Sequence, residues 1–106
     1  MGTRPNILLL LSDEHSPLEL GCMGGRLVRT PNLDTLAARG VTFDATYCQS
    51  PMCVPSRLSF LTGKYCWRIG AWSNAEPVPS GETSIMRFLG WHGYRTASIG
   101  KMHFLG

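Results

Sequence analysis

Long hydrophobic runs, blocks of like charge and a membrane-targeting leader are all missing from this sequence. Its longest apolar run, at residues 7–11, is too short for a secretory signal core or a membrane span. We therefore expect a cytoplasmic protein that has no membrane partner. The basic residues are scattered and the net charge is only +3. Nucleic acid is thus not an expected partner, whereas a small anionic substrate suits the mild positive balance.

The sequence also lacks a Cys-x-x-Cys pair, although it contains four cysteines. This spacing gives little support to a structural zinc site, and a cytoplasmic setting argues against two disulfides. We interpret Cys22, Cys48 and Cys66 as small buried residues, which is the commonest role of a free cysteine.

No internal repeat or low-complexity tract interrupts the chain, and its 106 residues make one small domain at most. A hydrophobic content of 43% with 16% charged residues is typical of a globular protein. We therefore look for alternating strands and helices rather than for linkers.

Three strands and three helices are predicted. Residues 7–12 form a near-continuous apolar run, which is typical of a strand covered on both faces in a parallel sheet. Shorter strands are expected at 41–43 and 96–99. Helices are expected at 30–40, from Pro55 to Gly63, and from a cap at Ser80 or Thr83 to about Trp91. This order predicts an α/β fold with a mostly parallel sheet flanked by helices.

The first of these helices has clear end signals. Thr30 can cap it, Pro31 suits its first turn, and Gly40 can end it. Residues 16–29 before it and 64–80 after the central helix are expected to be loops. Asn74 and the tryptophans of the second loop either shape a substrate pocket or pack beneath the loop.

Two adjacent carboxylates, Asp13 and Glu14, follow the first predicted strand. Sites in open α/β sheets gather at the carboxyl ends of the strands. Adjacent carboxylates repel each other unless a cation neutralises them, so the pair indicates a hard divalent ion such as Ca²⁺ or Mg²⁺. A solvated acidic turn is the alternative reading of the same residues.

The segment from Cys53 to Gly63 carries the strongest chemical signal. Pro55 places Cys53 at the start of a helix, where unpaired backbone N–H groups favour an anion and a reactive thiol. Arg57 projects from the same first turn, and its planar guanidinium suits a tetrahedral oxyanion. A buried structural cysteine beside an ordinary helix start is equally consistent with these residues alone.

Three ordered motifs resemble those of the sulfatase family. Cys53-Val-Pro-Ser-Arg57 followed by Leu61-Thr-Gly63 is similar to the family signature at every fixed position. The opening residues 4–14 resemble the family's first strand and its metal-binding acidic pair. The closing residues 100–106 resemble its Gly-Lys-x-His motif. The chain, residues 1–106, is thus identified as the N-terminal part of an alkaline-phosphatase-like sulfatase domain, and we expect it to be inactive alone.

The resemblance implies a site and a reaction. Cys53 would be oxidised to formylglycine by a maturation enzyme, and its hydrate would attack the sulfur of a small-molecule sulfate ester. Asp13, Glu14 and residue 53 would bind a divalent ion, Ca²⁺ with Mg²⁺ or Mn²⁺ as alternatives. Arg57 would steady the hydrate, Lys101 would contact the sulfate, and His103 would help remove the proton of the hydrate.

Two other functions remain open at this point. A phosphonate or phosphate ester hydrolase of the same superfamily would use the same anion site and metal. A non-catalytic remnant that keeps an anion site is the second, and it would retain an unmodified Cys53. Within the family, Gly100-Lys101-Met102-His103 and Ser73-Asn74 resemble choline-sulfatase-like bacterial enzymes.

Overall fold

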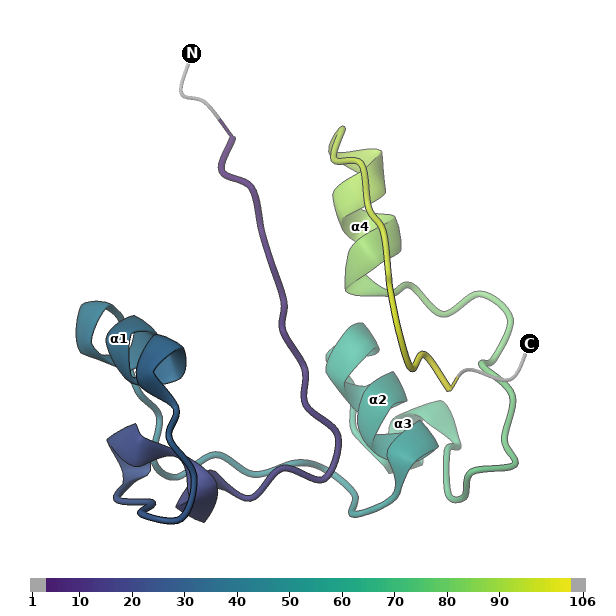
Figure 1. Cartoon of the computed structure of the whole chain (residues 1–106). Helices are drawn as coiled ribbons and strands as arrows, with labels where there is room; N and C mark the ends of the chain where they lie inside the picture. Colours follow the sequence, from purple (N-terminus) through teal and green to yellow (C-terminus); the bar gives the residue numbers. More distant parts are fainter. Residues whose placement is uncertain (1–3, 104–106) are drawn as a thin grey trace. The chain divides into compact units, whose positions relative to one another are not determined.

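The computed structural model describes residues 4–103, which divide into two compact units, one before and one after the boundary between Thr46 and Tyr47 (Figure 1). Each unit is built from short helices and connecting loops. The residues predicted to be catalytic all lie in the second unit, and the predicted acidic pair lies in the first.

The first unit contains two short 3₁₀ helices and one α-helix. They are η1 (Pro17–Glu19), η2 (Gly21–Met23) and α1 (Pro31–Arg39). Pro31 begins α1, and Gly40 follows its last residue, so the predicted helix at 30–40 is confirmed. The loop predicted at 16–29 is more ordered than expected because it contains η1 and η2.

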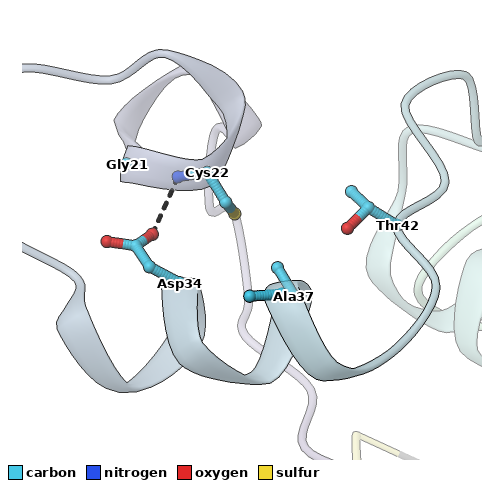
Figure 2. A pocket seen from close by; sticks show the side chains of 6 residues that line it. Gly21, Cys22, Asp34, Ala37 and Thr42 are labelled. Atoms are coloured by element: carbon cyan, nitrogen blue, oxygen red, sulfur yellow. Dashed lines mark hydrogen bonds between the residues drawn. The ribbon is translucent and has the colours of Figure 1, made fainter.

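The carboxylate of Asp34 joins η2 to α1. Its Oδ1 accepts a hydrogen bond from the Cys22 N–H at 2.7 Å, which Figure 2 shows, and another from the Thr30 hydroxyl at 3.0 Å. The same hydroxyl accepts the Gly21 N–H at 2.8 Å. Thr30 thus occupies the N-cap position of α1, but its side chain bonds the neighbouring loop instead of capping the helix.

The second unit contains three α-helices. They are α2 (Cys53–Thr62), α3 (Cys66–Ile69) and α4 (Ile85–Trp91) (Figure 1). α2 and α4 match predicted helices, whereas α3 lies in the stretch predicted to be loop. The N-cap of α4 is Ser84, whose Oγ accepts the Arg87 N–H, so the caps predicted at Ser80 or Thr83 were wrong.

The core of the second unit forms where α2 meets α3 and the chain that follows α3. Val54 and Leu58 from α2 pack with Ile69 and Ala71, and half-buried Val78 covers this cluster. Val54 and Leu58 lie four residues apart and so share one face of the helix. α2 is therefore the element that this core holds in place.

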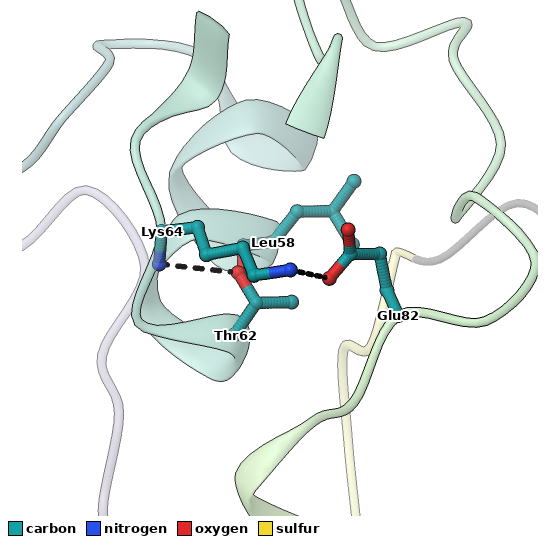
Figure 3. Close-up of polar contacts among 4 residues, drawn as sticks. All are labelled: Leu58, Thr62, Lys64 and Glu82. Atoms are coloured by element: carbon teal, nitrogen blue, oxygen red, sulfur yellow. Dashed lines mark hydrogen bonds and ion pairs between the residues drawn. The ribbon is translucent and has the colours of Figure 1, made fainter. Parts of the chain in front are cut away.

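The end of α2 is fixed by side-chain and backbone contacts that Figure 3 shows in part. Gly63 has φ 67° and its N–H bonds the Ser59 carbonyl, a helix end that glycine favours. The Thr62 hydroxyl donates to the Leu58 carbonyl at 2.7 Å. Lys64 Nζ pairs with Glu82 Oε2 at 2.6 Å, which ties the end of α2 to the loop before α4.

The predicted parallel sheet has no counterpart in residues 4–103, where the structure contains no strand. The segments 7–12, 41–43 and 96–99 have no ladder partners. Side chains at 7–11 are between 57% and 82% exposed, so the apolar run that predicted burial on both faces is covered on neither. A strand needs the hydrogen bonds of a neighbour, and propensity alone does not supply one.

Two further features of the described residues bear on the sequence predictions. None of their helices is long and apolar enough to cross a membrane. All four cysteines are free thiols. Cys22 and Cys48 are exposed and Cys66 is half-buried, so the prediction that all three are buried was wrong. Their surroundings are loops and the short helix α3, which cover little surface.

Candidate functional site

The N-terminus of α2 carries the predicted nucleophile. Cys53 is the first residue of the helix and is half-buried, and Pro55 lies in the first turn as predicted. The side chain of the N-cap residue, Met52, makes no hydrogen bond to the start of the helix. Val54, whose side chain is fully buried, anchors this turn in the core. The core therefore sets where Cys53 begins the helix.

A residue from a distant loop supplies the missing cap. Asn74 Oδ1 accepts a hydrogen bond from the Val54 N–H at 2.9 Å. That N–H belongs to the first turn and has no acceptor within the helix. Sequence reasoning named Asn74 only as a possible pocket residue, because a cap contributed from 20 positions away leaves no local pattern.

Cys53, Arg57 and Lys101, three of the four residues predicted to be catalytic, are linked by hydrogen bonds in the second unit. Lys101 Nζ donates to Cys53 Sγ at 3.7 Å, and Arg57 Nη1 donates to the backbone carbonyl of Lys101 at 2.9 Å. The two bonds close a loop between the start of α2 and a segment more than 40 positions later. The Lys101 ammonium thus lies close to the residue 53 side chain, where an oxyanion would gain most from it.

Arg57 contacts the segment that carries Lys101. Its guanidinium donates to the Lys101 carbonyl, so Arg57 holds that segment in place. Arginine suits this role because its donors diverge in a fixed plane. The predicted contact of its guanidinium with the nucleophile and nearby oxygens stays a prediction.

His103 has an uncommon backbone conformation, and one nitrogen of its own ring lacks a hydrogen-bond partner. Its φ is 54°, and Gly100 three residues before it has φ 100°. Its Nδ1 is buried and makes no hydrogen bond. Positive φ at a non-glycine residue costs free energy, and such residues concentrate at functional sites. A buried imidazole nitrogen without a partner is suited to receive a proton or a ligand hydrogen bond. The remaining motif residues, 104–106, lie outside the described part of the chain.

Asp13 and Glu14 belong to the first unit, and both are exposed. Glu14 shares with His103 a positive φ, 56°. No group of three or more histidine, cysteine or acidic residues within 4–103 is arranged to hold a metal ion. Asp13 and Glu14 are adjacent in the sequence and offer two carboxylates, the type of ligand that Ca²⁺ prefers.

Two hollows in the described part of the chain contain none of the predicted site residues. One of about 530 Å³ lies in the first unit between η2 and α1, where Cys22, Asp34, Ala37 and Thr42 line it (Figure 2). The other, of about 300 Å³, lies beside the end of α2 and is lined by Gly63, Lys64, Tyr65 and Arg68. The predicted site is described by a convergence of side chains at the start of α2.

Comparison with known proteins gives a consistent result. The sequence model of the family described as Sulfatase matches residues 5–106. The chain is 40% identical to human arylsulfatase D over 94% of its length, and 38% identical to human steryl-sulfatase over 96%. It is 37% identical to N-acetylglucosamine-6-O-sulfatase of Bacteroides thetaiotaomicron over 96% of its length. It covers 19%, 19% and 18% of these three proteins, about a fifth of each. No solved structure matched the chain.

Proposed function

Because this chain belongs to the sulfatase family, we propose that it carries the nucleophile half of a site that hydrolyses sulfate monoesters. The family has the alkaline-phosphatase-like fold. The observation that carries the proposal is the convergence of Lys101 and Arg57 on the segment of Cys53, inside the region that the family model matches. Cys53 would be converted to formylglycine by a maturation enzyme, which recognises this segment as its substrate.

The modification explains why a cysteine is required at this position. Formylglycine as its hydrate supplies one hydroxyl to attack sulfur and a second whose deprotonation expels the sulfate. A thiolate lacks the second hydroxyl and has no equivalent release route. The half-buried position at the start of α2 keeps residue 53 accessible to both the maturation enzyme and an ester.

Lys101 would bind the sulfate group of the substrate. Its ammonium lies 3.7 Å from Cys53 Sγ, so a tetrahedral anion that approaches residue 53 meets this charge directly. Negative charge develops on the leaving oxygen as its bond to sulfur breaks, and a fixed cation beside the ester stabilises the charge of the ester group. Arg57 would keep Lys101 in place through the Lys101 carbonyl.

His103 would handle the proton that sulfate release requires. Its Nδ1 has no competing hydrogen bond, so this nitrogen is available to a nearby hydroxyl. Asp13 and Glu14, with residue 53, would hold a divalent ion, for which their carboxylate oxygens are suitable ligands. Ca²⁺, Mg²⁺ or Mn²⁺ would supply Lewis acidity toward the substrate oxygens.

We also propose that residues 7–12, 41–43 and 96–99 pair in a parallel sheet within a domain of the length its relatives have. The exposed apolar run at 7–11 supports this proposal, because a sheet with both faces covered would remove those side chains from water. Lys101 and His103 would then follow the carboxyl end of the last of these strands, where sites in such sheets gather.

The test compares sulfate and phosphonate monoesters of the same alcohol with the protein purified from its native host. We expect the sulfate ester to be the better substrate. Cys53→Ala should abolish turnover, and Lys101→Ala should lower kcat/KM by about 10²–10³-fold, as for removal of one oxyanion donor. Cys22→Ala and Lys64→Ala are matched controls outside the site and should leave kcat/KM unchanged. Faster phosphonate hydrolysis, or full activity without Cys53, would overturn the proposal.

A further inference from the structure

Asn74, which lies outside α2, bonds the backbone beside the nucleophile. Its Oδ1 accepts the N–H of the peptide bond that joins Cys53 to Val54. The Val54 side chain is 0% exposed, so Val54 is held by the core on one side and by Asn74 on the other. Burial alone fixes the position of a side chain but leaves the adjacent peptide plane some freedom to rotate. The bond from Asn74 removes that freedom.

The loop that carries Asn74 is itself closed by short-range hydrogen bonds. The Glu76 carboxylate accepts the N–H of Trp72 at 3.2 Å and also the N–H of Ser73. Ser73 Oγ accepts the Ala75 N–H at 3.1 Å. Three bonds within five residues therefore hold the turn in a single conformation around Asn74.

Both ends of this loop are attached to the core that holds α2. Ala71, which is 1% exposed, belongs to the core cluster, and Val78 packs against it. Loop and helix start are thus anchored to the same core, and Asn74 bridges them. Asn74 can therefore fix the orientation of the peptide bond that it contacts, because the loop and the helix start are both anchored to the core.

We propose that Asn74 is a positioning residue for residue 53, an inference that rests on the proposed function. By holding the Cys53–Val54 peptide plane, it sets the direction in which the residue 53 side chain leaves the helix. Asn74 is assigned no contact with substrate. Its loss should therefore misalign the nucleophile and lower kcat, while substrate binding through Lys101 and the value of KM change little.

The test uses the full protein from its native host and three variants. Asn74→Ala removes the acceptor, Asn74→Asp keeps an acceptor of the same length, and Asn32→Ala is the matched control on α1. We expect Asn74→Ala to lower kcat by about 10-fold or more with KM within about 3-fold. Asn74→Asp should recover most of kcat, and Asn32→Ala should change neither parameter. A fall in KM and kcat that Asp does not rescue would overturn the proposal.

A second measurement separates this proposal from the proposed function. Hydrogen exchange of the Val54 amide should accelerate by about 10-fold in Asn74→Ala and stay slow in Asn74→Asp, whereas the Leu58 amide stays protected in both. This readout needs no catalytic activity. If the protein has no sulfatase activity, the proposed function fails, and unchanged Val54 exchange would overturn the role of Asn74 independently.

A further substitution at position 74 covers the case in which the Asn74→Ala protein does not fold. Asn74→Gln keeps the amide but moves its oxygen by one methylene group, so Val54 exchange should accelerate and kcat should fall in a folded protein. Accelerated exchange with unchanged kcat would show that the bond exists but does not position the nucleophile, and would also overturn the proposal.

Discussion

Substitution of Leu58 by alanine tests whether the small cluster around α2 is the core of the second unit. Leu58 is 2% exposed and packs with Val54, Ile69 and Ala71. A buried Leu→Ala change typically costs about 2–5 kcal/mol, through lost transfer free energy and the cavity left behind. This cluster is small and can collapse partly around the change, so we expect about 2–3 kcal/mol.

The assay is urea unfolding of the chain, followed by the fluorescence of its three tryptophans, Trp67, Trp72 and Trp91, which all belong to the second unit. With a denaturant slope of about 1.5 kcal/mol/M, the expected loss moves the midpoint down by about 1–2 M. Leu27→Ala is the matched control, because Leu27 is 89% exposed and the same change should shift stability by less than about 0.5 kcal/mol. Equal midpoints for the two variants would refute the assignment of this core.

Two further predictions concern single contacts. Gly21→Ala should lower Tm, because its Cβ would lie 2.6 Å from Asp34 Oδ2. Gly90→Ala in α4, where a Cβ meets nothing within 4 Å, should raise stability by about 0.5–1 kcal/mol. An unchanged Tm for Gly21→Ala would contradict the packing of η2 on α1. The hydrogen bonds of Ser73, led by its side chain, lower the pKa of Glu76 below its ordinary value of 4.5. The stabilisation by Glu76 should therefore be complete above its unfolded pKa and be lost as pH falls through the lowered folded pKa, and a carboxyl titration followed by NMR that gave a pKa above 4.5 would contradict this.

The helices were predictable from sequence where end signals and spacing agree. α1 has Pro31 at its start and Gly40 after its end, and α2 ends at Gly63, whose positive φ is the reason a glycine stands there. The spacing of Val54 and Leu58 places both in the core. α3 escaped prediction because a helix of four residues has no period to detect.

The sheet shows the opposite case. An apolar run such as residues 7–11 indicates that burial of the segment is favourable. A strand exists, however, only when a neighbouring strand supplies its hydrogen bonds. Such long-range pairing is not encoded in the run itself. For that reason the strands stay a prediction for a domain of the relatives' length, while the helices, whose bonds are local, are already formed.

The contacts at the candidate site were not predictable from the sequence. The resemblance to the family motifs indicated Cys53, Arg57 and Lys101, and the structure links these three by hydrogen bonds, while their catalytic roles stay predictions. The sequence could not indicate that Arg57 bonds the Lys101 carbonyl or that Asn74 caps α2, because both contacts join positions 20 or more apart. The choline-sulfatase-like substrate, the roles of Asp13 and Glu14 and the cytoplasmic location stay predictions.

The chemical state of residue 53 tests the central claim most directly. The protein would be purified from its native host, digested with trypsin, and the peptide from residue 40 to Arg57 analysed by mass spectrometry. We predict that this peptide has lost the cysteine sulfur and carries an aldehyde or its hydrate, which reacts with a hydrazide reagent. A free thiol at position 53 would contradict the assignment of residue 53 as a formylglycine nucleophile.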